Sequence, residues 1–373
     1  MQLHKLFLIN FKNYSEADIN FSAKFNCFVG DNGQGKTNLL DAIHYLSFCK
    51  SFFNPIDSQN ILNDAPFFVI QGEFINEENT ENIYCGLKRN EKKKFKRNQK
   101  EYSKLADHIG LIPLVLISPA DAELITDGSE FRRKFMDSAI AQHNKTYLEK
   151  LITYNKILSQ RNALLKNFNE KRYFDKDSLE IWDAQLITAG EYINKKRGAF
   201  IREFLPLFQK FYIHISGNNE TVGIEYESKL NENSFQSLLL ESLPKDRNVL
   251  YTTCGIHKDD LVFKINEFPI KKMGSQGQQK TFLLALKLAQ FEYLKKIKKS
   301  LPLLLLDDIF DKLDQKRVAR LMEIVGSDDF GQIFITDTNS QRISEILFNL
   351  QLPFKTFKID KGTVVEELKT STI

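Results

Sequence analysis

The chain has 373 residues, of which 42% are hydrophobic and 27% charged, with a formal net charge of +4 at pH 7. This balance is typical of globular domains and argues against a disordered chain. The weak positive charge permits nucleic-acid binding without requiring it. The longest apolar runs fall well short of the roughly 18 residues that cross a bilayer, so no membrane partner is expected. The four cysteines are far apart, which argues against a disulfide framework or a zinc site and indicates a reducing, cytoplasmic environment.

The first 118 residues are rich in short strand signals. Apolar and polar residues alternate in several segments, which predicts partly exposed antiparallel strands, with a hairpin turn at 98–100. The segment 114–117 is continuously apolar and predicts a fully buried strand instead. The predicted strands cover residues 3–8, 18–21, 25–29, 67–74, 83–87, 93–97 and 114–118.

The middle of the chain changes to helical patterns. Apolar residues recur at three- and four-residue spacing from 131 to 165 and again from 179 to 193, and we expect Pro206 to end the second helical stretch. Strand signals return at 211–226 and 250–265, and a long helix is predicted at 276–299. The helices are far too short for the coiled coil of a full SMC protein.

The last part of the chain alternates buried strands with helices, which predicts a mainly parallel sheet. Strands are expected at 303–306, 332–336, 354–359 and 363–366, and helices at 315–325 and 340–348. We therefore predict an α/β fold with a mixed sheet and flanking helices. Residues 1–118 and 301–373 would form one discontinuous lobe, and residues 119–300 would form an inserted, mainly helical second lobe.

A complete phosphate-binding motif follows the predicted strand at 25–29. Its pattern, Gly-x-x-x-x-Gly-Lys-Thr, runs into a predicted helix, and this order of strand, glycine loop and helix is the context that defines a P-loop. The glycines let backbone N–H groups surround phosphates at a helix N-terminus, the lysine reaches the terminal phosphates, and the threonine binds Mg²⁺. The predicted ATP-binding residues are Gly30, Asp31, Asn32, Gly33, Gln34, Gly35, Lys36 and Thr37.

Two carboxylates end the apolar strand at 303–306. Asp307 is predicted to hold Mg²⁺ together with Thr37, because P-loop proteins place a carboxylate at the end of a buried strand for this purpose. Asp308 is the candidate catalytic residue, placed to orient or deprotonate the attacking water. Since aspartate is one methylene shorter than the glutamate common at this position, we expect slow hydrolysis.

A second anion-binding turn precedes the helix at 276–299. Ser275, Gly277 and Gln278 lie in a Ser-x-Gly-Gln turn at a helix N-terminus, which binds anions through its N–H groups. The simpler interpretation is that Ser275 caps the helix. Because one nucleotide does not need two phosphate grips in one chain, we favour a homodimer in which each turn meets the terminal phosphate held by the other chain.

The P-loop, the Gly-Ser-Gln-Gly-Gln turn, the Leu-Leu-Leu-Leu-Asp-Asp strand and the Leu-Asp loop that ends at Asp314 resemble, in this order, the ABC-type ATPase head. Within that class the chain resembles the RecF family from end to end. Several of the shared blocks have no general ATPase purpose, which makes the resemblance specific. The blocks lie at 8–14, 31–41, 47–52, 116–119, 131–137, 255–261, 276–280 and 307–314.

The resemblance implies an ATP-dependent homodimer that uses Mg²⁺ and adds Asp314 to the nucleotide-binding residues. It also implies binding to single-stranded and to gapped or junction duplex DNA, and loading of RecA together with RecR and RecO. ABC heads usually place a histidine where this chain has Asp337, so that role is left unassigned. The glutamine that couples the two lobes is unassigned as well.

Two basic segments are candidates for DNA contact. The run at 88–100, which contains Phe95, could bind phosphates or form the solvated face of a hairpin, and we prefer the second interpretation. The three basic residues at 132–134 could touch DNA or pair with Glu130 and Asp137, and the sequence does not separate these interpretations.

Two other functions share parts of this pattern. The motor subunit of a membrane transporter has a similar head, but the helical insertion here is long and no coupling glutamine is evident. A metabolic P-loop kinase would leave the turn at 274–278 unexplained. A nucleotide-gated, DNA-binding ATPase is therefore the leading prediction.

Overall fold

The computed structural model describes residues 1–76, 79–217, 220–310 and 314–369. Contacts divide the chain into two compact units. The first contains Met1–Asp121, Phe211–Gly217 and Lys280–Ile373, and the second contains Ala122–Lys210 and Asn218–Gln279. This division differs from the lobes expected at 119–300 and outside it, because most of helix α8 (Gln276–Lys298) groups with the first unit.

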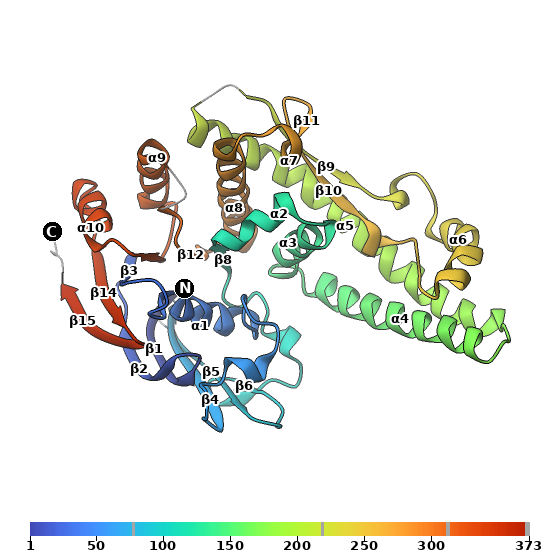
Figure 1. The fold of residues 1–373 in the computed structure, drawn as a ribbon, viewed down its shortest axis with the longest axis horizontal. Coiled ribbons are helices and arrows are strands. Elements are labelled where there is room, and N and C mark those ends of the chain that lie inside the picture. Colours follow the sequence, from blue (N-terminus) through green and yellow to red (C-terminus); the bar gives the residue numbers. More distant parts are fainter. Residues whose placement is uncertain (77–78, 218–219, 311–313, 370–373) are drawn as a thin grey trace. The chain divides into compact units, whose positions relative to one another are not determined.

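An antiparallel sheet forms one layer of the first unit, with strand order β2-β1-β4-β5-β6-β7 (Figure 1). One face of it is buried, as the alternating pattern predicts, and the other faces outward. Its strands are β1 (Gln2–Phe11), β2 (Tyr14–Asn20), β4 (Phe67–Asn76), β5 (Asn79–Lys88), β6 (Lys94–Arg97) and β7 (Lys100–Glu101).

The second sheet of this unit has the order β15-β14-β3-β13-β12-β8, with all pairs parallel except the edge pair β14 and β15. The parallel strands therefore end at one common edge. Helix α1 (Lys36–Phe48) contacts strands of both sheets, and its apolar residues join the core between them. The strands are β3 (Phe25–Val29), β8 (Leu114–Ile117), β12 (Leu303–Leu306), β13 (Ile333–Asp337), β14 (Phe354–Asp360) and β15 (Thr363–Lys369).

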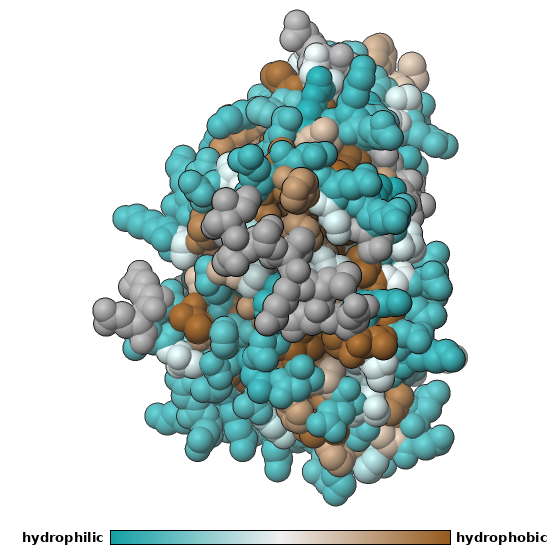
Figure 2. Space-filling view, turned by 90° about the vertical axis from the view of Figure 1, so that its left-hand side faces the viewer, coloured by the Kyte–Doolittle hydropathy of each residue, from teal (hydrophilic) through white to brown (hydrophobic). Residues whose placement is uncertain are grey.

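Helices α9 (Gln315–Gly326) and α10 (Ser340–Asn349) complete the first unit. Figure 2 views the side on which α10 and β15 lie in Figure 1, and hydrophilic side chains predominate there, with apolar ones scattered between them. Helix α10 buries Ile343 and Leu347 and leaves Phe348 68% exposed. Isolated exposed apolar side chains of this kind are ordinary on a protein surface.

The second unit contains helices and a small antiparallel sheet in the order β11-β10-β9. Its longest helix is α5, and the last residues of this helix belong to the segment Phe211–Gly217, which groups with the first unit. The elements are α2 (Glu123–Thr126), α3 (Ser129–Ala141), α4 (Lys145–Glu170), α5 (Lys176–Ser216), β9 (Val222–Glu227), α6 (Phe235–Val249), β10 (Asp260–Ile265), β11 (Phe268–Pro269) and α7 (Ile270–Met273).

The prediction that Pro206 ends a helix is wrong, and so is the strand expected from residue 211. Helix α5 continues through Pro206 to Ser216. A proline inside a helix costs about 3 kcal/mol, but apolar residues continue on both sides of it. Phe204 packs edge-on against Phe135 of α3, and Phe208 is fully buried. Burial of this apolar stripe outweighs the missing hydrogen bond.

Helix α6 is absent from the predicted elements. It contains Pro244, and only a few of its apolar residues are buried, so its helical pattern is weak. Ser234 marks its start by accepting a hydrogen bond from the Ser237 N–H group at 3.1 Å. None of the helices in the described ranges is long and apolar enough to span a bilayer.

Buried histidines predict acid destabilisation. Burial lowers the pKa values of His44, His108 and His257 to about 4. The His108 ring bonds the Leu46 carbonyl through Nε2 at 2.6 Å and the Tyr102 hydroxyl through Nδ1 at 3.1 Å, and burial outweighs the Leu46 carbonyl, which favours the charged ring. Since the unfolded chain takes up these protons near pH 6.5, stability is complete above that pH and falls as the pH drops toward 4.

At pH 5 each such histidine should lower the free energy of unfolding by about 2 kcal/mol relative to pH 7.5. Urea unfolding at the two pH values measures this difference. In His108→Gln the difference in unfolding free energy between the two pH values should be smaller by the contribution of one histidine. In His4→Gln, a change at an exposed position, this difference should equal that of the wild type. Equal pH dependence in the wild type and His108→Gln would contradict the prediction.

Candidate functional site

The P-loop has the backbone that a phosphate cradle needs. Gly33 and Gly35 adopt φ angles of 80° and 115°, which favour glycine. A Cβ atom on Gly30 would lie 2.3 Å from the Ile359 carbonyl oxygen, so this position also requires glycine. Gly35 is the N-cap of α1 and supplies no side-chain cap, which leaves the helix N-terminus open toward the loop.

The side chain of Lys36, the first residue of α1, folds back onto the loop. Its side chain is nearly buried, and Nζ donates hydrogen bonds to the Gly30 carbonyl at 2.7 Å and the Asp31 carbonyl at 2.9 Å. Asp31 and Asn32 are exposed. The loop therefore encloses a cation and presents its outer residues to solvent, which suits an anionic ligand.

Two hairpin turns distant in sequence hold the loop in shape. At the turn between β1 and β2, Tyr14 donates its hydroxyl to the Gly35 carbonyl at 3.1 Å, and the Asn13 amide donates to the Gln34 carbonyl at 3.0 Å. From the turn between β14 and β15, the Gly362 N–H donates to the same carbonyl at 2.9 Å. These bracing residues are absent from the predicted site, because no local signal links them to the motif.

A carboxylate and two hydroxyls meet beside the loop. Asp307 Oδ1 accepts hydrogen bonds from the Thr37 and Thr336 hydroxyls, each at 2.8 Å. Burial raises the pKa of Asp307, and the two hydrogen bonds oppose that effect. Mg²⁺ prefers such hard oxygen ligands and is usually held by one or two of them plus phosphates. The described residues therefore fit a magnesium site, in which Thr37 and Asp307 would hold the ion. Thr336 was not predicted, although it precedes Asp337 on a buried strand.

Asp308 follows in a left-handed turn with φ 45°, and its N–H group donates to the Thr336 hydroxyl at 2.9 Å. Such a conformation is uncommon for a non-glycine residue and occurs often at functional sites. Thr336 thus contacts both aspartates of the acidic pair. The catalytic role of Asp308 stays a prediction.

The two other predicted nucleotide-binding elements are helix caps in this chain. Asp314 caps α9 by accepting the Arg317 N–H group at 3.0 Å. Ser275 and Gln278 cap α8 reciprocally, since each side chain accepts from the other's N–H group, at 3.2 and 2.7 Å. Ser275 is exposed, so its hydroxyl is accessible to a ligand from outside. A cap and a phosphate contact are compatible roles, and the second stays a prediction.

Structural contacts engage several members of the basic run at 88–100. Lys93 Nζ donates to the Asp57 carboxylate at 2.7 Å and to the Cys49 carbonyl at 2.6 Å. Phe95 is buried in the core, and Arg97 pairs with Glu81. The hairpin interpretation is therefore favoured for these members.

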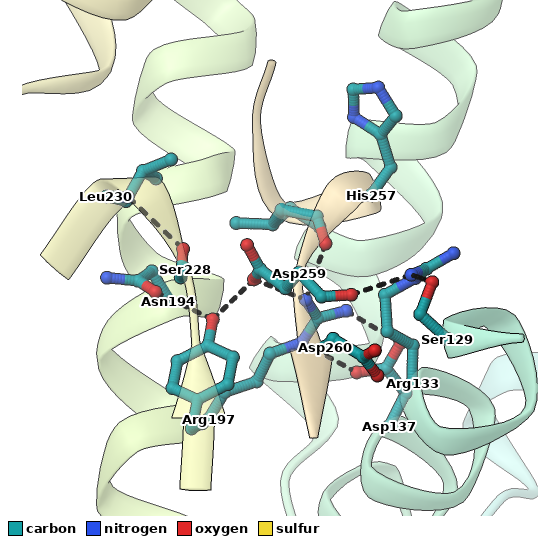
Figure 3. A network of polar contacts seen from close by, with 12 residues as sticks. Ser129, Arg133, Asp137, Asn194, Arg197, Ser228, Leu230, His257, Asp259 and Asp260 are labelled. Carbon is teal, nitrogen blue, oxygen red and sulfur yellow. Dashed lines mark hydrogen bonds and ion pairs between the residues drawn. The ribbon is translucent and has the colours of Figure 1, made fainter. Parts of the chain in front are cut away.

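The basic residues at 132–134 form ion pairs or hydrogen bonds within the second unit. Arg132 pairs with Asp260 at 2.7 Å, and Lys134 pairs with Glu130 at 2.7 Å. Arg133 donates to the Asp259 carbonyl at 2.7 Å (Figure 3). The pairing with Glu130 that the sequence left open is therefore found for Lys134, whereas Asp137 pairs with Arg197 instead of with this segment.

Figure 3 also shows contacts that join the segments 131–137 and 255–261. Arg197 of α5, only 1% exposed, pairs with Asp137 of α3 at 3.0 Å and with Asp259 at 2.8 Å. Burial raises the pKa of Asp259 although Arg197 opposes this. Removing one member of such a buried pair is strongly destabilising, so these blocks hold the second unit together.

Asp337, whose role was unassigned, ends β13 with 2% of its surface exposed. It accepts two hydrogen bonds from the Arg342 guanidinium of α10. Arg342 was not a predicted site residue, because its pairing depends on how α10 folds back toward the strand end.

Comparisons with known proteins identify the family. The family described as the RecF/RecN/SMC N terminal domain matches residues 2–358. The DNA replication and repair protein RecF of Phocaeicola vulgatus is 53% identical over 368 residues, which cover 98% of each chain. The RecF of Flavobacterium johnsoniae is 54% identical over 359 residues, covering 96% of this chain and 100% of its own.

Solved structures agree. A structure described as the recombination mediator protein RecF with ATP in the RecFOR pathway matches with a TM-score of 0.89 and 32% identity, covering 98% of this chain and 97% of the other. An Smc head domain from Pyrococcus furiosus, 19% identical, matches with a TM-score of 0.57 over 99% of this chain and 96% of its own, and shares the fold. The predicted ABC-type ATPase head fold is therefore confirmed. The chain belongs to the RecF family of DNA replication and repair proteins.

Proposed function

We propose that this chain is an ATP-dependent DNA-binding protein of recombinational repair and replication-fork maintenance. The observation that carries the proposal is the convergence of Thr37, Asp307 and Thr336 beside a complete P-loop. That arrangement suits the magnesium salt of a nucleotide, and a related RecF structure is described with ATP.

In this proposal each P-loop residue has a defined task. The N–H groups of the loop and of the α1 N-terminus surround the phosphates, and Lys36 moves from its two carbonyl partners to the terminal phosphates. Thr37 and Asp307 would hold Mg²⁺, which would neutralise charge on the phosphates. Asp308 orients the attacking water, and its short side chain makes hydrolysis slow, so that ATP acts as a switch.

The switch is dimerisation. Ser275, Gly277 and Gln278 of one chain close over the terminal phosphate held by the other, and Asp314 contributes from the Leu-Asp loop. Support comes from the exposed Ser275 hydroxyl at the N-terminus of α8, where a helix favours an anion. Because ADP lacks the terminal phosphate, two ADP-bound chains associate less tightly than two ATP-bound chains. Hydrolysis therefore releases the partner chain.

The nucleic-acid and protein partners follow from the family. The dimer binds single-stranded DNA and gapped or junction duplex DNA, and acts with RecO and RecR to load RecA. The support is the high identity to RecF proteins and the RecFOR pathway named for the related structure. The transporter alternative has no support, because the relatives compared are DNA replication and repair proteins.

DNA binding measured across a salt series with ATP, ADP and no nucleotide tests this function. We expect the highest affinity for gapped duplex with ATP, and an affinity that falls linearly on logarithmic axes as salt rises. An uninterrupted duplex of the same length is the control substrate. Equal affinity in all three nucleotide states would overturn the proposed switch.

A further inference from the structure

The carboxyl edge of the parallel sheet brings a third acidic position next to the nucleotide site. Strand β13 lies between β3, which leads into the P-loop, and β12, which leads into Asp307. Its last residue, Asp337, pairs in register with Val29, the residue before the loop begins. Neighbouring strands lie about 4.8 Å apart, so Asp337 is close to both the P-loop and the acidic pair.

The Asp337 carboxylate holds Arg342 in a fixed orientation. Arg342 Nε donates to Oδ2 at 2.9 Å and Nη2 donates to Oδ1 at 2.5 Å, which is the bidentate geometry that restricts a guanidinium most. The Asn339 N–H also donates to Oδ1, at 3.0 Å. On another side, the guanidinium lies 5.7 Å from the centre of the Phe310 ring, in the loop that follows Asp308. The Arg342 side chain is 32% exposed.

The negative charge gathered at this edge of the sheet explains why a cation is needed beside the terminal phosphate. Asp307, Asp308 and Asp337 stand at the ends of adjacent strands, and a terminal phosphate placed beside them would meet strong repulsion. Lys36 and Mg²⁺ offset part of it. Arg342 supplies a further positive charge at the same edge, from a different element, and a planar guanidinium suits phosphate oxygens.

We propose that Arg342, oriented by Asp337, contacts the terminal phosphate of a nucleotide bound in the same chain and thereby distinguishes a triphosphate from a diphosphate. The inference rests on the proposed nucleotide binding and deepens it. Asp337 is then a positioning residue, and the chain uses an aspartate–arginine pair at the position where ABC heads usually place a histidine.

The test compares affinities for a nonhydrolysable ATP analogue and for ADP, with Mg²⁺, by isothermal titration calorimetry. A hydrogen bond between charged groups corresponds to about a 10- to 100-fold change in affinity. Arg342→Ala should weaken the ATP analogue by about that factor and change ADP affinity less than about threefold. Arg342→Lys keeps the charge without the fork and should lose less.

Two further variants separate this role from a structural one. Asp337→Asn removes the charge that orients Arg342, and should reduce the preference for the ATP analogue with ADP affinity unchanged. Arg202→Ala removes an exposed arginine of α5 and should leave both affinities unchanged. Melting temperatures confirm folding, and Arg342→Lys serves if Arg342→Ala does not fold.

The outcomes distinguish the two proposals. Loss of affinity for the ATP analogue alone supports a terminal-phosphate contact. Unchanged affinities, or equal losses for both nucleotides, in a folded Arg342→Ala variant would overturn the role of Arg342 and leave the proposed function standing. If Arg342→Ala does not fold, the same results in Arg342→Lys would do so. A wild-type protein that binds neither nucleotide would overturn both.

Discussion

Replacing Lys36 with alanine is expected to lower ATP affinity on the order of 100-fold, because each charged hydrogen bond to a phosphate that is lost weakens binding about tenfold or more. The ammonium group is the cation that the P-loop encloses, bonded to the Gly30 and Asp31 carbonyls. Without it those carbonyls lose their donor, and the terminal phosphates lose their nearest fixed positive charge. ATP-dependent dimerisation and the effect of ATP on DNA affinity should disappear with it.

Calorimetric titration with ATP and Mg²⁺ measures the loss directly. Lys156→Ala, at an exposed position of α4, is the matched control and should bind ATP like the wild type. Lys36→Ala should also bind DNA with the same weak affinity in ATP, ADP and no nucleotide. A folded Lys36→Ala protein that keeps wild-type affinity for ATP would place the nucleotide elsewhere and contradict the site.

The part of the site that lies within one sequence segment could be predicted. The apolar strand 25–29, the glycine loop and helix α1 follow one another directly, and each requires residue types that the sequence displays. The buried strand that ends at Asp307 has the same property, because four consecutive leucines leave little alternative to a central parallel strand. In these two segments the local pattern and the final structure agree.

The remainder depends on contacts between distant residues. Pro206 is a helix breaker by local rules, and the burial of Phe204 against Phe135 decides against that rule. The hydrogen bond from the Gly362 N–H to the Gln34 carbonyl likewise joins residues whose relation no motif reveals. The pairing of Arg342 with Asp337 spans only five residues, but it depends on the turn by which α10 follows β13.

Replacing Ser275 with arginine is expected to abolish ATP-dependent dimerisation while each chain still binds ATP within about threefold of the wild type. Ser275 caps α8 and is exposed, so the larger side chain fits a single chain at the cost of the cap, about 1 kcal/mol. In the proposed dimer the same side chain would fill the space reserved for the partner's terminal phosphate. Hydrolysis needs both halves of the site, so the loss of dimerisation should also lower the hydrolysis rate.

Light scattering of the purified protein, with and without ATP and Mg²⁺, reads out the association state. Ser234→Arg is a closely matched control, because Ser234 is also an exposed N-cap serine, at the start of α6 in the same unit. It should lose a similar amount of stability and still dimerise. If Ser275→Arg dimerises as fully as Ser234→Arg, the turn at 274–278 is a helix cap and nothing more, and the two-chain enclosure of the nucleotide is wrong.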